Sequence, residues 1–476
     1  MSAAAPEVTG GASCVTSETA MAKRSVWTTQ GPISWPSSPP LMSYTALRDI
    51  ETCPLRWALR HGEYADIWTG RGYPSAPAGA TVAGHVVHVA LERVVRAVGA
   101  MHHEVPSSHA APNADPMIPV VNALRSLGGI SAVLNDLVQE TISEWEMNPR
   151  LWPRATEMAA ELQRQVPALR PRVQQFLGSV DLGRLRPARD PGGTNMRVRA
   201  NAEVRPLAPG VYAEVPLVDA GLGWYGKADL LRVGGGERNA DDAILDFKTG
   251  QAKPDHAFQL RIYALLWARD TRRNPAGRRA RKLTVLYGDA AIEVPAPHSD
   301  RDLDEVAQEL GDRTEHARAA VEHHPPVARP SCEACEWCDV RHMCPAYWQP
   351  ATRAAITSSA DLLRHGIDAG VQILQQQGAW RWVARVREVG ALSDEISEGA
   401  RVLLRGRPHD EHFVAIIRVG ARMRVVGAQF VAASEESGGL PVLSLTRSTE
   451  AFTVLENTSA TGRTPADEPP ISLLDR

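Results

Sequence analysis

The chain has 476 residues, of which 43% are hydrophobic and 22% charged, and its formal net charge is −3. This composition is typical of a globular protein with about two or three domains, and it excludes a fibrous or wholly disordered chain. No run approaches the roughly 18 apolar residues of a membrane helix, and no apolar signal core opens the chain. We therefore expect a cytoplasmic protein with no membrane partner.

The first 350 residues pass from helical patterns to strand patterns. Residues 1–41 are rich in Ser, Thr, Ala, Gly and Pro, which predicts a disordered N-terminal tail. Helical periodicity follows in three regions: 43–60, 82–98 and 115–180. Period-two stretches then predict four strands: 196–206, 211–218, 223–233 and 243–248. The later predicted elements are a helix at 254–269, a strand at 282–288 and a helix at 301–322. This order predicts an α/β domain over residues 42–350.

The pattern changes again after residue 350. A helical segment at 360–376 predicts a helical linker over 351–378. Five short strand-like stretches follow, at 380–389, 400–406, 412–419, 422–432 and 440–446. They predict a small C-terminal β domain over 379–457, for which an OB-like barrel is one interpretation, and residues 458–476 read as a flexible tail.

The cysteines are unevenly distributed. Four of the six, Cys332, Cys335, Cys338 and Cys344, fall within 13 residues, while Cys53 stands alone near the start of the predicted domain. In a cytosolic chain, such clustering indicates a metal or iron–sulfur site rather than disulfides. A local zinc site with four cysteine ligands is one interpretation.

Two predicted neighbouring strands carry acidic side chains that can converge. Asp246 and Lys248 share one face of the strand at 243–248, because side chains two apart on a strand point the same way. A hairpin with the preceding strand brings Asp229 towards Asp246, and two converging carboxylates are suited to Mg²⁺ or Mn²⁺. Only five of the 52 basic residues are lysines, so a lysine beside this pair suggests a function.

Two helices add polar side chains at helical spacing. His88 and Glu92 lie one turn apart, as do Gln259 and Tyr263. Each of these residues taken singly is more typical of a helix packed in a core than of a site.

Together these motifs resemble RecB-type nucleases of the PD-(D/E)XK superfamily, over residues 42–350. The shared motifs, in order, are Gly84-x3-His88-x2-Leu91-Glu92, Gly226-Lys227-Ala228-Asp229, Asp246-Phe247-Lys248-Thr249-Gly250, Gln259-x3-Tyr263 and Cys335-x2-Cys338-x5-Cys344-Pro345. The resemblance implies a restriction-endonuclease-like core, in which helices flank a central mixed sheet, with a helical insertion. A further acid on the strand before Asp229 is often present in the family, and Glu214 and Glu203 are the two candidates.

The resemblance also implies roles for these residues. His88, Asp229, Asp246 and the main-chain carbonyl of Phe247 would hold Mg²⁺ or Mn²⁺. Lys248 would position the attacking water and stabilise charge on the phosphate. Gln259 and Tyr263 would orient Lys248 or the nucleic-acid backbone.

For the cysteines, the resemblance selects Cys53, Cys335, Cys338 and Cys344 as ligands of a structural [4Fe–4S] cluster. Cys332 is then spare. The local zinc site is the alternative.

Basic residues suggest where a nucleic acid is held. Arg272, Arg273, Arg278 and Arg279 follow the helix that bears Tyr263, and we expect phosphate contacts there. The predicted C-terminal domain mixes tryptophans with arginines, a pattern that suits single-strand binding, partner binding or packing equally well.

We conclude that the sequence predicts a metal-dependent deoxyribonuclease, with an exonuclease as the favoured form. Repair, recombination, CRISPR adaptation and phage defence are the settings that the resemblance implies, with single-stranded or end-containing DNA as substrate and a helicase or a CRISPR or defence protein as partner. The alternative is a catalytically silent nucleic-acid-binding or assembly protein whose nuclease-like fold is held together by zinc or a cluster.

Overall fold

The computed structural model describes residues 26–68, 71–77, 79–104, 117–178, 204–235, 241–287, 290–356, 366–393, 395–407 and 416–455. They divide into two compact units, each described here by itself. The first contains Val26 and Pro32–Ala346, and the second contains Trp27–Gly31 and the chain from Tyr347 onward.

A five-stranded mixed sheet forms the centre of the first unit, with the strand order β1-β2-β3-β4-β5. β1 (Gly210–Asp219), β2 (Trp224–Val233) and β3 (Asp242–Phe247) form an antiparallel meander. β4 (Ala280–Tyr287) is parallel to β3, and β5 (Ala290–Val294) pairs antiparallel with β4. A parallel pair needs a crossover connection, and α8 (Pro254–Arg269) supplies it. The predicted α/β class with a mixed sheet is therefore confirmed.

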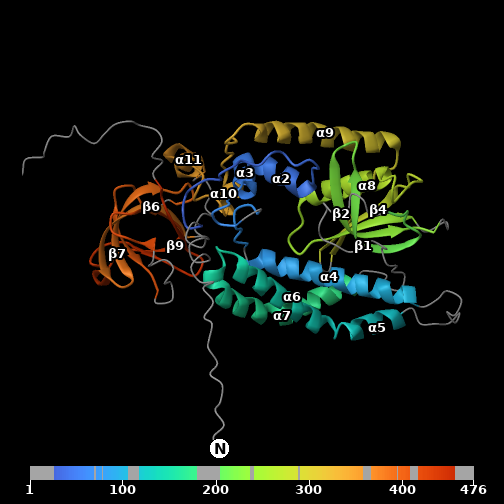
Figure 1. Ribbon diagram of the computed structural model, residues 1–476, viewed down its shortest axis with the longest axis horizontal. Helices are drawn as coiled ribbons and strands as arrows, with labels where there is room; N and C mark the ends of the chain where they lie inside the picture. Colours follow the sequence, from blue (N-terminus) through green and yellow to red (C-terminus); the bar gives the residue numbers. More distant parts are fainter. Residues whose placement is uncertain are drawn as a thin grey trace, which may run out of the picture. The chain divides into compact units, whose positions relative to one another are not determined.

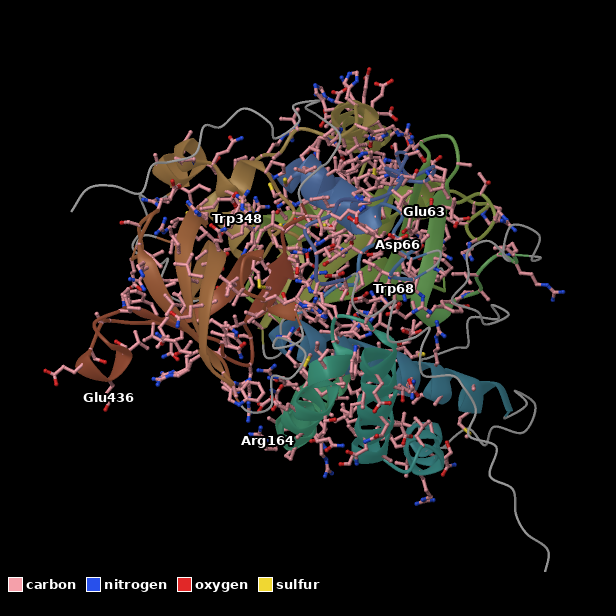
Figure 2. All side chains as sticks on the ribbon, turned by 60° about the vertical axis from the view of Figure 1, so that its left-hand side comes forward. Glu63, Asp66, Trp68, Arg164, Trp348 and Glu436 are labelled. Atoms are coloured by element: carbon pink, nitrogen blue, oxygen red, sulfur yellow. The ribbon has the colours of Figure 1, made fainter. Side chains whose placement is uncertain are left out.

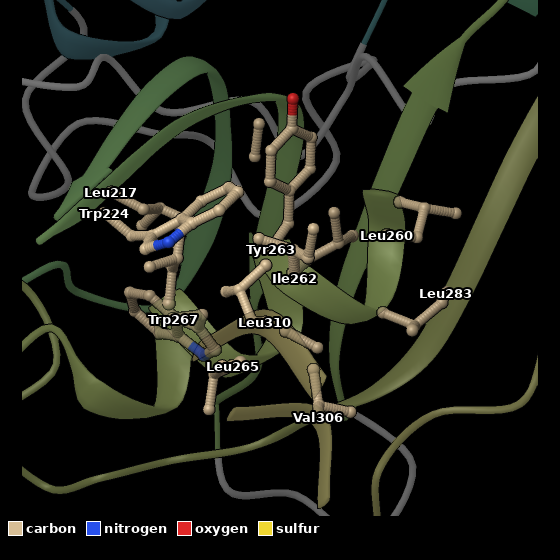
Figure 3. Packing of buried hydrophobic residues seen from close by; sticks show 14 of the residues in the cluster. Leu217, Trp224, Leu260, Ile262, Tyr263, Leu265, Trp267, Leu283, Val306 and Leu310 are labelled. Carbon is tan, nitrogen blue, oxygen red and sulfur yellow. The ribbon is translucent and has the colours of Figure 1, made fainter. Parts of the chain in front are cut away.

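Helices cover both faces of this sheet (Figure 1). α8, α9 (Asp300–Glu322) and α2 (Tyr44–Thr52) lie on one face, where Trp224, Trp267 and Leu310 are buried (Figure 3). The other face packs against α4 (Gly79–Glu104), whose neighbours are α5 (Ile118–Ser126), α6 (Ile130–Met147) and α7 (Ala155–Gly178). The last three form the predicted helical insertion.

The helix predicted at 43–60 is broken in two. α2 ends at Thr52, and α3 runs from Pro54 to His61. Between them Cys53 is extended, with φ −162° and ψ 106°, because the ring of Pro54 disfavours helical backbone at the preceding residue. This break sets Cys53 at the junction of two helices. Two further short helices among the described residues of the unit are η1 (Trp152–Arg154) and α10 (Cys332–Glu336).

The second unit is a β-barrel preceded by η4 (Ala346–Trp348) and α11 (Pro350–Ile356). Its strands are β6 (Ile367–Gly378), β7 (Arg381–Val389), β8 (Arg401–Arg405), β9 (Arg422–Val431), β10 (Val442–Ser444) and β11 (Glu450–Thr453). β10 pairs with β8 in parallel and with β9 antiparallel, which closes the ring β10-β8-β7-β6-β9. A closed five-stranded barrel of this kind agrees with an OB-like architecture.

The core of the barrel is apolar, and Trp382 is buried there with 1% of its surface exposed. The ring of Trp348 lies 4.6 Å from the Arg424 guanidinium (Figure 2). A short 3-10 helix, η6 (Glu435–Ser437), carries Glu436 away from the strands (Figure 2). Because its ring is enclosed in the apolar core, Trp382 contributes to the packing of the barrel.

Four predictions about local structure are wrong. Residues 367–376 lie in strand β6 instead of a helical linker, because Ile367, Ala369, Val371 and Ile373 alternate into the barrel core. Residues 26–41 are not a disordered tail: Trp27 is buried and packs on Phe452 within the second unit. Residues 204–206 and 416–419 are not strands.

Several predictions fall outside the described residues: 1–25, 196–203, 357–365, 408–415 and 456–476. Strands β5 and β11 were not predicted. Among the described helices, none combines the length and apolar character that crossing a membrane requires.

Candidate metal centre

Two adjacent strands bring Asp229 and Asp246 together. The register pairs Leu230 on β2 with Leu245 on β3, so the two aspartates occupy neighbouring positions. Asp229 Oδ2 accepts a hydrogen bond of 2.7 Å from the main-chain N–H of Phe247. Both aspartates are buried: 8% of the surface of Asp229 and 1% of the surface of Asp246 are exposed. The hairpin predicted from the sequence is thus present.

Glu214 on β1 adds a third buried carboxylate. It lies opposite Asp229, between the paired positions Ala213↔Leu230 and Val215↔Ala228. Its φ of 53° is left-handed, a conformation that costs a residue with a side chain about 1–3 kcal/mol.

The sheet changes face at this level of β1 and β2. Ala213 and Leu230 face the core under α4, whereas Val215 and Ala228 face the core under α8, although residues two apart on a strand normally share a face. The strained backbone at Glu214 accompanies this change. Of the two acids considered from the sequence, Glu214 is the one found here, and Glu203 lies outside the described residues.

Helix α4 supplies a histidine to the same cluster. His88 Nε2 lies 2.9 Å from Glu214 Oε1 and 3.6 Å from Asp229 Oδ1. One donor atom each from His88, Glu214 and Asp229 lie within 4.8 Å of one another. The helix approaches the end of β3 closely at Gly84, where a Cβ would lie 2.5 Å from Thr249 Oγ1. Glycine at this position therefore allows the helix to bring His88 to the strands.

The charges of this cluster are coupled. Burial would lower the pKa of His88, but the hydrogen bond to Glu214 and the charge of Asp229 outweigh it and raise the pKa to about 9. Burial and the charge of Asp246 raise the pKa of Asp229 to about 7. Burial also raises the pKa of Asp246, against the attraction of Lys248. Burial opposes ionisation of Glu214, yet its contacts with His88 and Lys227 lower its pKa overall.

Two lysines face these carboxylates. Lys248 Nζ lies 2.8 Å from Asp246 Oδ2, and the Lys248 N–H donates to Leu286 O at 2.9 Å, which holds the end of β3 against β4. Lys227 forms an ion pair with Glu214 and lies 4.0 Å from Glu92 Oε2. Lys227 was not among the predicted site residues, whereas Glu214 was one of the two candidate acids. The retention of lysine in an arginine-rich chain was the one signal that pointed to Lys227.

Helix α8 places Gln259 and Tyr263 beside the strands. Gln259 Nε2 donates to the Tyr263 hydroxyl at 2.7 Å. The Tyr263 ring packs in the core, while its hydroxyl points out of the cluster (Figure 3). Burial and the charges of Asp246 and Asp229 raise the pKa of Tyr263, so the phenol stays protonated and able to donate.

Helix α3 and the cysteine segment lie against each other. The Arg329 N–H donates to Cys53 Sγ at 3.5 Å, and Arg60 Nε donates to Asp339 Oδ1 at 2.7 Å. Burial, with the nearby Cys344 and Cys53, raises the pKa of Cys335 to about 11.

Cys338 is also buried, which raises its pKa to about 12. The structure thus brings Cys53 near Cys335, far along the chain. Among the described residues, no three cysteine thiols lie within 4.8 Å of one another.

The arginines at 272–279 have partners inside the molecule. Arg273 bonds to Asp270, Arg278 to Asp242 and Arg279 to Asp300. The Arg272 N–H donates to Asp270 Oδ1. These residues lie before the first residue of β4, whereas Lys248 follows the last residue of the parallel strand β3. They therefore lie at the opposite end of strands β3 and β4 from the acidic cluster. This position argues against the predicted phosphate contacts.

Comparison with known protein families identifies a related superfamily. A family model described as the PD-(D/E)XK nuclease superfamily matches residues 41–345, which is more than half of the chain and includes the acidic cluster and the cysteine segment. No match was found among curated proteins.

Proposed function

The chain belongs to the PD-(D/E)XK nuclease superfamily, and on that premise we propose that it is a metal-dependent nuclease that hydrolyses DNA. The observation that carries the proposal is the convergence of His88, Glu214 and Asp229 beside the strand that ends in Asp246, Phe247 and Lys248. Three buried carboxylates in one cluster lose hydration and repel one another, and a bound divalent cation would offset that cost beyond what the neighbouring cationic groups supply.

The donor set fits Mg²⁺ or Mn²⁺. Carboxylate oxygens are the ligands that both ions prefer, and a single imidazole is compatible with Mn²⁺ in particular. Asp246 Oδ2 is buried and accepts no hydrogen bond of ordinary geometry from the described residues, although the Lys248 ammonium lies 2.8 Å away. His88, Glu214, Asp229 and Asp246, with the carbonyl of Phe247, would hold the cation.

Each residue then has a role in hydrolysis. A bound divalent cation supplies Lewis-acid polarisation of the phosphate and lowers the pKa of water. Lys248 holds the attacking water and places positive charge where the phosphate oxygens gain negative charge. Tyr263, whose hydroxyl accepts a hydrogen bond from Gln259, would orient Lys248 or the nucleic-acid backbone together with Gln259. Lys227 forms an ion pair with Glu214 and would balance its charge in the metal-free protein.

The test is cleavage of end-labelled single-stranded and double-stranded DNA, and of RNA, with added Mn²⁺ or Mg²⁺. We expect metal-dependent cleavage of DNA from an end and at least a hundredfold loss in Lys248→Ala. Lys282→Ala is the matched control, because Lys282 is an exposed lysine of the same sheet that pairs with Glu293. Equal cleavage by the two variants would refute the role proposed for Lys248, and DNA binding without cleavage by the unaltered protein would favour the silent binding protein.

We also propose that Cys53, Cys335, Cys338 and Cys344 hold a structural [4Fe–4S] cluster, as four thiolates can. The proximity of Cys53 and Cys344 to Cys335 supports this ligand set. In a zinc site each thiolate lies about 2.3 Å from the ion, so the thiolates lie closer together than 4.8 Å. Among the described residues no three cysteine thiols lie that close, which favours the larger cluster. In protein purified without oxygen, we expect iron and sulfide to be lost in Cys53→Ser and kept in Cys332→Ser. The reverse result would indicate a local site.

A further inference from the structure

One outer face of the barrel places arginines opposite arginines. The antiparallel register of β7 and β8 pairs Arg381 with Arg405 and Arg385 with Arg401. Directly opposed residues point to the same side of a sheet, and all four side chains are exposed. The residues between them on the opposite face, such as Trp382, fill the barrel core.

This arrangement does not serve the stability of the barrel. Like charges directly opposite each other destabilise a strand pair. Within the described residues none of the four guanidinium groups has an ion-pair partner, and Arg405 donates to Ser444 Oγ at 3.1 Å. On β9, by contrast, Arg424 is paired with Glu388 at 3.0 Å. The β7–β8 face therefore presents positive charge that the fold does not neutralise.

A cavity continues this face at the end of β8. Its volume is about 510 Å³, within the range of small-molecule sites. The described residues that line it include three arginines and three hydroxyl side chains but no carboxylate: Arg405, Arg407, Arg447, Ser444, Thr446 and Ser448. Guanidinium and hydroxyl donors are suited to phosphate oxygens.

An indole lies beside this cavity. Trp380, in the turn between β6 and β7, is partly exposed, and its carbonyl accepts a hydrogen bond of 2.9 Å from the Gly406 N–H. A Cβ at Gly406, which lines the cavity, would lie 3.6 Å from Trp380 Cε3. The ring is therefore within reach of a group bound among the arginines.

We infer that the β7–β8 face and its cavity bind single-stranded nucleic acid, with phosphates on the arginines and a base stacked on Trp380. β7 and β8 are the second and third strands of the barrel, the face that OB-folds use for oligonucleotides. Stacking on an indole needs an unpaired base, which a duplex does not offer. This inference is independent of the proposed nuclease activity, because it rests on the barrel alone.

The test measures binding of the full-length protein to a fluorescent oligo-dT of about 20 nucleotides, without added divalent cation. We expect the double variant Arg385→Gln/Arg401→Gln to bind at least tenfold more weakly. The slope of log affinity against log salt should fall by about 1.4, or about 0.7 for each lost phosphate contact. Its melting temperature should not fall, because an unfavourable charge pair has been removed. Trp380→Ala should weaken binding by about 5- to 150-fold, and Trp380→Phe by less.

The matched control is Arg164→Gln/Arg301→Gln, which removes the same charge from α7 and α9; Figure 2 shows Arg164. Equal weakening in the two double variants would overturn the inference, as would equal competition by a duplex or no binding by the unaltered protein. No metal is added in the binding assay, so its result does not depend on cleavage. If the protein binds the oligonucleotide here but does not cleave DNA when metal is added, only the proposed nuclease activity is refuted. A protein that cleaves without this binding refutes only the barrel site.

Discussion

The contact between Gly226 on β2 and Tyr263 on α8 tests how the metal centre is assembled. A Cβ at position 226 would lie 2.7 Å from Tyr263 Cε1 and 2.9 Å from Cδ1, closer than real Cβ contacts. The ring cannot move away freely, because Tyr263 is 7% exposed and packed in the core. Overpacking of this size costs about 1–3 kcal/mol. We expect Gly226→Ala to lower the free energy of unfolding by that amount.

The assay is urea unfolding followed by circular dichroism, with DNA cleavage measured in parallel. Cleavage should fall as well, because the displaced ring moves its hydroxyl away from Gln259. Gly250→Ala is the matched control: a Cβ there meets nothing within 4 Å, so stability should change by less than about 0.5 kcal/mol.

In a Tyr263→Leu background, Gly226→Ala should cost at least 1 kcal/mol less than alone, since contacting residues show coupling of this order. The explanation fails if Gly226→Ala and Gly250→Ala are equally stable, or if the Tyr263→Leu background leaves the cost of Gly226→Ala unchanged.

Three further predictions concern packing, capping and protonation. Leu310→Ala, at a fully buried position between α9 and α8, should cost about 2–5 kcal/mol in the same unfolding assay, and a cost below 1 kcal/mol would contradict the described core. Ser299→Ala removes the capping box that Ser299 forms with Asp302, and should lower stability by about 0.5–2 kcal/mol. Because the pKa of His88 is raised to about 9, its protonation stabilises the metal-free protein fully below pH 6.5, and this contribution is lost as pH rises through 9. Mn²⁺ binding at pH 8 should therefore release a proton from His88, seen in calorimetry as a heat that depends on the buffer; binding without such a release would refute the assignment of His88 as a ligand.

Much of the nuclease-like unit could be predicted from the sequence, because the relevant signals are local. The helix at 254–269 has the same bounds in the structure. Asp246 and Lys248 share a strand face by simple alternation, and their ion pair is present. Such relations depend only on the period of one element.

Other features depend on how segments far apart in the chain pair with each other, and local sequence patterns do not show this pairing. Glu214 joins the cluster through a left-handed backbone at a change of strand face, which alternation alone would not predict. The same limit explains the strand at 367–376, where pairing with β7 and β9 outweighs a helical pattern.

The partners of the charged residues and of the cysteines also depended on the tertiary structure. The sequence by itself determined which residue types were available: a few lysines, a cysteine cluster and many arginines. Only the tertiary structure decided their partners, placing Cys53 beside the cysteine segment, pairing Arg278 with Asp242, and setting Arg385 opposite Arg401. The physical reason is that an ion pair or a metal site depends on distances of a few ångströms, and for residues far apart in the chain the packing of whole elements sets those distances.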